Sequence, residues 1–140
     1  MSRRQKKFEL LPHTADLRMR VHGRTLEDLF QNALVGFAAI VGKGIERGTA
    51  AVPQEARLEA DSTANLLVEF LNEALYFMNV NKAVYDRAVF TEFSETALHG
   101  ILRGQTVDGF AEDVKAVTYH GAEILGDATG NFIVELVFDV

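Results

Sequence analysis

The sequence predicts a single α+β domain in which a largely antiparallel sheet of about six to seven strands packs against two main helices. Three observations support this class. A length of 140 residues is typical of one domain. Hydrophobic residues make up 48% of the chain, which is enough for a buried core. Two segments have apolar residues at helical spacing, whereas several others are rich in β-branched and aromatic residues.

The first elements are two short strands and a helix. Phe8–Leu11 indicates a strand, and Leu17–His22 alternates apolar with basic residues, the period of a half-buried strand. Thr25 is placed to cap a helix whose first turn carries acidic residues, which the helix dipole favours. Apolar residues then recur at helical spacing as far as Val41, and Gly42 is suited to end the helix.

A third strand and a second helix follow. Thr49–Ala60 indicates a strand that is broken or lies at a sheet edge near Pro53, because proline cannot donate a ladder hydrogen bond. Ser62 offers a second helix cap, and apolar residues from Leu66 onward form the buried face of the helix. We expect Asn79–Asn81 to close it.

The remainder of the chain is strand-like, with turn residues between the segments. The expected strands are Val84–Phe93, Ala97–Thr106, Val114–Leu125 and Phe132–Asp139. The resulting order, β-β-α-β-α-β-β-β-β, favours an α+β domain.

The charge is distributed unevenly between a basic start and an acidic body. Residues 1–7 carry Arg3, Arg4, Lys6 and Lys7 and no acid, and we expect a basic flexible tail there that is either solvated or in contact with RNA or a membrane. Residues 8–140, the predicted domain, hold the other 10 basic residues and all 20 acidic ones, a net charge of −10. A domain with this much negative charge binds a phosphate backbone poorly. We therefore expect any action on RNA to be indirect.

Several classes of function are disfavoured. The absence of cysteine excludes disulfides, a thiolate zinc site and a cysteine nucleophile. No Walker A loop, dinucleotide-binding glycine motif or nucleophile elbow is present. The chain has no signal-peptide pattern and no apolar stretch of the ~20 residues that span a bilayer, so we expect a cytoplasmic protein without membrane association.

Polar groups with chemical potential occur in four places. His13 and Asp16 flank the entry to the second strand, where each is a ligand or acid/base candidate or else a turn residue. Glu69 and Glu73 are four residues apart on the second helix, where they either share a cation or acid/base role or form a solvated face.

The other two places are in the last strands. Lys115 enters an apolar strand, where it either meets a carboxylate or anion or lies along a sheet edge. Asp139 precedes the terminal carboxylate of Val140, and the two negative charges repel unless a cation or basic group lies between them; otherwise they form a frayed terminus.

Taken in order, these segments resemble the archease family. The resemblance is carried by five blocks, Phe8–Asp16 with its His-Thr-Ala-Asp motif, Gly23–Phe30, Leu66–Glu73, Val114–His120 with its Lys-Ala-Val-Thr-Tyr-His motif, and Val137–Val140. It covers nearly the whole chain from Phe8. The family fold would be an α+β domain over residues 8–140.

The resemblance implies an activator of an RtcB-type RNA-splicing ligase, which serves tRNA splicing and RNA repair with GTP and Mn²⁺. Such a protein promotes ligase guanylation and turnover without joining RNA itself. The family's metal ligands correspond to Asp16, Asp139 and Val140, with Ca²⁺ expected and Mg²⁺ as the alternative. Lys115 corresponds to a residue needed for activation, and Glu69, Glu73 and His13 would lie in a supporting shell.

One departure from the family concerns residues 104–113. Many members have a longer stretch there that contains a histidine, whereas this segment is short and has none. The fit to a partner can therefore differ.

Two other hypotheses remain beside the activator. A general chaperone or modulator of RNA-processing enzymes would act independently of Asp16. A metal-dependent hydrolase using Asp16, Glu69, Asp139 and Lys115 would turn over substrate alone.

Overall fold

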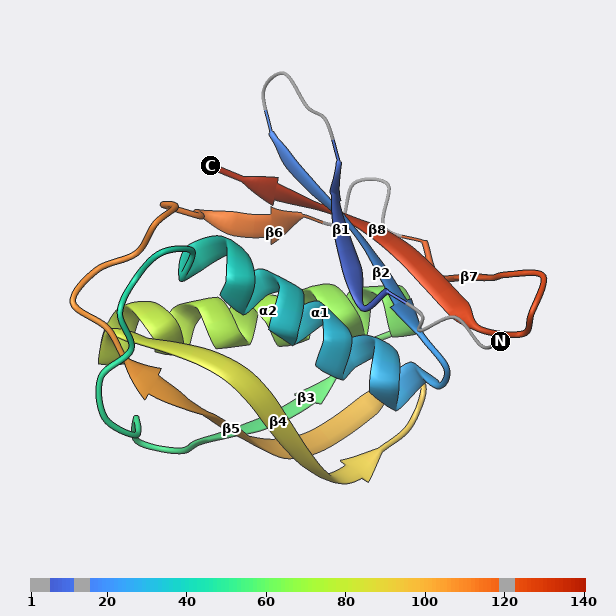
Figure 1. Ribbon diagram of the computed structural model, residues 1–140. Helices are drawn as coiled ribbons and strands as arrows, with labels where there is room; N and C mark the ends of the chain where they lie inside the picture. Colours follow the sequence, from blue (N-terminus) through green and yellow to red (C-terminus); the bar gives the residue numbers. More distant parts are fainter. Residues whose placement is uncertain (1–5, 12–15, 119–122) are drawn as a thin grey trace, which may run out of the picture.

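The protein has two helices lying between two antiparallel sheets (Figure 1). We describe it from a computed structural model that defines residues 6–11, 16–118 and 123–140. Within these residues there are eight strands, and all their pairings are antiparallel. The predicted α+β class is confirmed, with the strands divided between two sheets instead of one.

Sheet A contains the ends of the chain. Its strands are β1 (Phe8–Leu11), β2 (Leu17–Gly23), β6 (Ala116–Thr118), β7 (Leu125–Gly126) and β8 (Phe132–Asp139). The spatial order is β1-β2-β8-β6, and β7 also pairs with β8. Strand β8 is therefore central, with β2 on one side and β6 and β7 on the other.

Sheet B is made by the middle of the chain. Its strands, in the spatial order β3-β5-β4, are β3 (Gln54–Glu59), β5 (Ala97–Thr106) and β4 (Ala83–Phe93). The expected break near Pro53 is observed, since β3 begins only at Gln54 and an isolated bridge joins Ala50 to Gln105.

Both helices begin at the predicted caps. Helix α1 (Leu26–Val41) starts after Thr25, whose hydroxyl accepts a hydrogen bond from the Asp28 amide at 3.0 Å. Helix α2 (Thr63–Asn81) starts after Ser62, which accepts one from the Asn65 amide at 3.1 Å. Each cap satisfies a backbone donor that has no partner within the helix.

The helices form the centre of the core. Ten of the 16 residues of α1 are buried, so its apolar surface is wider than one sheet can cover. It packs on β4 of one sheet and β2 of the other. Phe30 on α1 meets Phe70 on α2 at a ring-centroid distance of 5.8 Å. The wide apolar face explains why the strands divide into two sheets around the helices.

The predicted strand Val114–Leu125 is not continuous. Among the described residues of this segment, Ala116–Thr118 and Leu125–Gly126 are the strands, and both pair with β8. Thr118 is paired with Val137, and Leu125 is paired with Ile133. The chain advances seven residues from Thr118 to Leu125 but only four along β8. The two strands therefore pair with β8 in registers that differ by three residues.

Two further expectations concern the basic tail and a membrane span. Residues 1–5 of the predicted tail lie outside them, while the Lys7 carbonyl accepts a hydrogen bond from the His22 amide at 3.1 Å. No helix among the described residues is long and apolar enough to cross a membrane.

Candidate functional site

The end of β8 is anchored by alternating burial. Val134, Leu136 and Phe138 are buried, whereas Glu135 and Asp139 point to the opposite, exposed face. The Phe138 ring has no exposed surface and stacks on Phe37 of α1 with centroids 5.3 Å apart. The strand therefore presents the Asp139 carboxylate to solvent from a fixed backbone.

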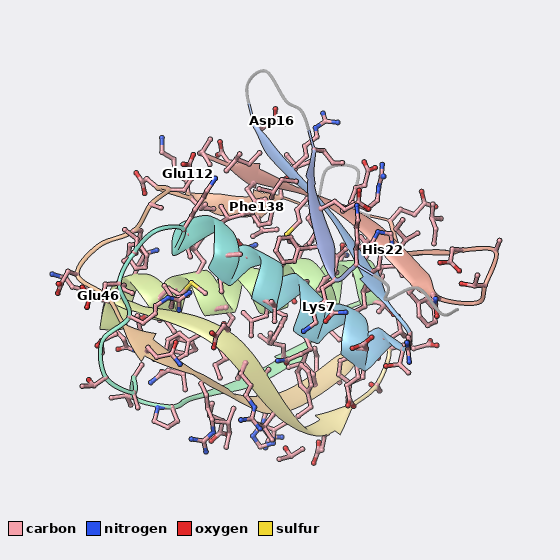
Figure 2. All side chains as sticks on the ribbon, viewed as in Figure 1. Lys7, Asp16, His22, Glu46, Glu112 and Phe138 are labelled. Carbon is pink, nitrogen blue, oxygen red and sulfur yellow. The ribbon has the colours of Figure 1, made fainter. Side chains whose placement is uncertain are left out.

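The register of β2 and β8 brings Asp16 to the same place. Leu17 pairs with Phe138, so Asp16 and Asp139 are the next residues on two neighbouring strands. Figure 2 shows Asp16 at the start of β2, beyond the packed part of sheet A. Among the described residues, Asp16 forms one ion pair, between its Oδ2 and Arg18 Nε at 4.0 Å, and both side chains are well exposed. Such a contact contributes little.

Lys115 reaches this position from the other side of β8. Its amide donates to the Asp139 carbonyl at 2.7 Å, and Ala116 is paired with Asp139 in the β6–β8 ladder. The backbones of Asp16, Lys115, Asp139 and Val140 thus lie at three adjacent strand ends, and we call these residues the strand-end cluster. Asp16, Lys115 and Asp139 are far apart in the sequence, and their placement at adjacent strand ends follows from the central position of β8.

The cluster offers oxygen ligands and one amine. Within the described residues, the carboxylate of Asp139 and the ammonium of Lys115 have no ion-pair partner. The described residues hold no group of three or more His, Cys, Asp or Glu side chains able to bind a metal. A cation bound by Asp16 and Asp139 would complete its shell with the terminal carboxylate, backbone oxygens or water, all of which suit a hard cation.

Asn72 links helix α2 to the strand that follows Lys115. Its Nδ2 donates to the Val117 carbonyl at 2.9 Å, and the Val117 amide donates to its Oδ1 at 2.8 Å. The side chain therefore replaces a neighbouring strand at the free edge of β6. Sequence patterns alone predict no role for Asn72; its position beside Glu73 on the polar face of an apolar helix is the one signal they offer.

Glu69 and Glu73 lie on α2 beside Asn72, and both are half-buried. They do not join Asp16 and Asp139 in a single metal-binding group of the described residues. Helix α2 packs on the buried side of sheet A, whereas Asp139 faces away from it. Their supporting role stays a prediction. His13 and His120 lie outside the described residues.

The segment 107–115 connects the two sheets. Its backbone donates three hydrogen bonds, from Val107 to Lys82, from Ala111 to Val41 and from Lys115 to Asp139. They fix the segment to the ends of α2, α1 and β8. Because Val107 and Val114 are also buried, the position of Lys115 is held by the ends of both helices.

The fold and the strand-end cluster define the class of protein. It is a small α+β domain that carries exposed carboxylates and an exposed lysine at three adjacent strand ends. The archease protein family model (MTH1598/TM1083) matches residues 8–140, and the chain belongs to this family. This confirms the resemblance seen in the sequence.

Relatives and solved structures agree with this membership. Protein archease from Methanosarcina barkeri (strain Fusaro / DSM 804) is 34% identical over 93% of this chain and 94% of its own length. Protein archease from Pyrococcus furiosus is 33% identical over 96% of this chain and 99% of its own. These names describe no catalysed reaction.

Two solved structures share the fold. The solution structure of protein 1598 from Methanobacterium thermoautotrophicum has a TM-score of 0.68 at 23% identity, over 97% of this chain and 100% of that one. The crystal structure of an archease from Thermotoga maritima, described as a possible chaperone, has a TM-score of 0.66 at 20% identity, over 100% and 99%.

Proposed function

We propose that this protein is a non-catalytic activator of an RtcB-type RNA-splicing ligase in tRNA splicing and RNA repair. It promotes guanylation and repeated turnover of the ligase through the strand-end cluster, and it contacts RNA only indirectly. The observation that carries the proposal is the convergence of Asp16, Lys115, Asp139 and Val140 at three adjacent strand ends. Membership of the archease family supports it. A cytoplasmic location stays a prediction.

A divalent cation, Ca²⁺ in the first place and Mg²⁺ as the alternative, fits the donor set. Asp16 and Asp139 supply carboxylate oxygens on neighbouring strands, and within the described part of the chain the one basic side chain paired with either is Arg18, at 4.0 Å. A bound cation would neutralise their repulsion and fix both carboxylates.

Lys115 has a different role in this proposal. Because its backbone is fixed to Asp139 while its side chain is exposed, its ammonium is available to an anionic group of the partner. Phosphate oxygens of the ligase's nucleotide cofactor are a group of this kind. The carboxylates would face positive charge or metal on the ligase, so both signs of charge contribute to recognition.

The test is multiple-turnover RNA ligation by the cognate ligase with GTP and Mn²⁺, with and without this protein. Asp16→Asn and Asp139→Asn remove one charge each at the cluster, and Glu95→Gln removes one at the exposed β4–β5 turn as the matched control. Stimulation by wild type and Glu95→Gln, but not by the cluster variants, is expected. No stimulation by wild type would reject the proposal.

A general chaperone or modulator of RNA-processing enzymes is the alternative, and the description of the Thermotoga maritima structure favours it. It predicts protection of unrelated proteins from aggregation, to the same extent by wild type and Asp16→Asn. A metal-dependent hydrolase, in contrast, would cleave substrate in the absence of any ligase.

A further inference from the structure

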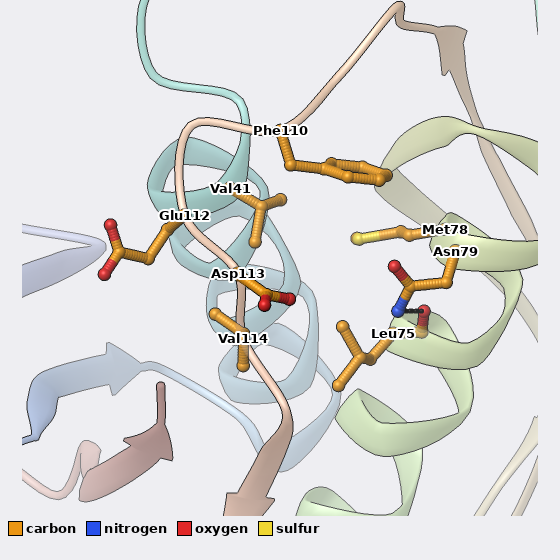
Figure 3. A pocket seen from close by; sticks show the side chains of 8 residues that line it. All are labelled: Val41, Leu75, Met78, Asn79, Phe110, Glu112, Asp113 and Val114. Atoms are coloured by element: carbon orange, nitrogen blue, oxygen red, sulfur yellow. Dashed lines mark hydrogen bonds between the residues drawn. The ribbon is translucent and has the colours of Figure 1, made fainter.

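A cleft of about 220 Å³ lies between the last turns of α1 and α2 and the segment 107–115 (Figure 3). It is separate from the strand-end cluster, but its lining ends at Val114, the residue before Lys115. The lining residues are Val41, Leu75, Met78, Asn79, Phe110, Glu112, Asp113 and Val114. Pockets for small organic ligands typically measure about 300–1,000 Å³, so this cleft suits a single side chain better.

The walls of the cleft are mostly apolar. Val41 and Met78 come from the helix ends and are almost completely buried, and the Phe110 ring extends from the opposite segment toward Met78 (Figure 3). The hydrogen bond from the Ala111 amide to the Val41 carbonyl, 2.7 Å long, holds the two sides together. The cleft is therefore preformed.

Its polar groups include two hydrogen-bond acceptors, from Asp113 and Asn79. The Asp113 carboxylate points into the cleft toward Asn79, whereas that of Glu112 points away (Figure 3). The Asn79 Nδ2 donates to the Leu75 carbonyl at 3.1 Å, which leaves the amide oxygen as an acceptor. No lining residue is basic, and Asp113 has no ion-pair partner among the described residues.

We propose that this cleft receives an arginine side chain of the partner ligase, an inference that rests on the proposed function. The aliphatic stem of arginine would lie along the apolar walls, and the planar guanidinium has donors enough for Asp113 and Asn79 together. A carboxylate and a guanidinium form strong, directional hydrogen bonds. Docking here places the ligase beside Lys115, whose backbone continues directly from the cleft.

The experiment measures ligase binding and ligase stimulation separately. Asp113→Lys reverses the charge inside the cleft, and Asp113→Asn removes it with little change of shape. Asp108→Asn is the matched control, because Asp108 is an exposed acid on the same segment outside the lining. Affinity for the immobilised ligase is measured by biolayer interferometry, and stimulation is titrated to saturation in the ligation assay.

Asp113→Lys should weaken binding and raise the half-stimulating concentration by about tenfold or more, while the maximal stimulation is retained at saturation. Asp113→Asn should have a smaller effect in the same direction, and Asp108→Asn should stay within about twofold of wild type. Cluster variants, in contrast, should lose maximal stimulation.

Two results would overturn the inference, and they are distinguishable. If wild type binds and stimulates the ligase and Asp113→Lys does so at the same concentrations, the cleft is not a docking site. If wild type neither binds nor stimulates, the proposed function fails and the docking site fails with it. Circular dichroism of Asp113→Lys shows that a loss of binding is not a loss of folding.

Discussion

The side-chain amide of Asn72 is paired with both backbone groups of Val117, donating to the carbonyl at 2.9 Å and accepting from the amide at 2.8 Å. One side chain on α2 thus occupies the position that a further strand would take beside β6. Val117 is only 2% exposed, so these backbone groups have little access to water in its place.

Asn72→Leu should therefore lower the free energy of unfolding by about 1–3 kcal/mol, because it leaves the backbone donor and acceptor of buried Val117 without partners. Urea denaturation measures this, and hydrogen exchange of the Val117 amide should accelerate. Asn65→Ala, which removes an exposed amide from the same helix, is the control and should change stability by much less. Unchanged exchange at Val117 would contradict the assignment.

The terminal carboxylate can be displaced without altering a side chain. Adding Gly-Ser after Val140 moves this group beyond the ends of β2 and β6 while Asp16 and Asp139 stay in place. If the carboxylate is a ligand, Ca²⁺ affinity measured by calorimetry should fall by about tenfold or more. The same dipeptide added before residue 1 should have no effect. Equal Ca²⁺ affinities for the two extended proteins would remove Val140 from the site.

Gly104 is required by the close approach of two strands in sheet B. A Cβ at this position would overlap the carbonyl oxygen of Val84 and lie 2.7 Å from the Tyr85 Cα, and backbone atoms of a paired strand cannot move away. Gly104→Ala should destabilise the protein by about 1–3 kcal/mol or more. Gly109→Ala, where a Cβ meets no atom within 4 Å, is the control. Equal thermal midpoints for the two variants would refute this account.

The turn between β7 and β8 should make stability depend on pH. The Asp127 carboxylate accepts from the Thr129 hydroxyl at 2.6 Å and from the Thr129 and Asn131 amides at 2.8 and 3.0 Å. These hydrogen bonds, led by that of the hydroxyl, hold the pKa of Asp127 below its ordinary value of 3.8. Its stabilising contribution is therefore complete above that ordinary value and is lost as the pH falls through the lowered one.

Asp127→Asn removes the charge and keeps an acceptor oxygen. We expect the variant to be less stable than wild type at neutral pH, with the difference shrinking as the solution is acidified through the range in which Asp127 titrates. Urea midpoints measured at several pH values test this. A difference that is the same at pH 7 and at the acid limit would show that the charge of Asp127 does not matter.

Local signals in the sequence predicted the elements well. The structure confirms the helix caps Thr25 and Ser62 and the bounds of the strand Phe132–Asp139. Capping residues and alternating apolar residues are recognisable in the sequence itself, because each depends on residues close together in the chain. Pairing between strands leaves no such mark. The division into two sheets and the interruption of Val114–Leu125 depend on which edge of β8 is free and on its register.

The candidate site shows the same contrast. Residue types and the family resemblance selected Asp16, Lys115 and Asp139, but only the strand order places their backbones at adjacent strand ends. Asn72 and Asp113 belong to no recognisable sequence motif. The role of each depends on the residues that pack beside it, which only the structure shows. These positions were predictable only as polar residues.

Strand β8 is the last strand of the described chain, yet it lies between β2 and β6 and pairs with both, one on each side. During synthesis, more than a hundred residues are added after Asp16 before β8, the strand that pairs with β2, emerges from the ribosome. Without residues 132–139, β2 and β6 would have no common neighbour, so Asp16 and Lys115 would not lie at adjacent strand ends. Assembly of the strand-end cluster therefore depends on the presence of β8, and a separately supplied peptide of this strand is the natural candidate to complement, in trans, a chain that lacks it.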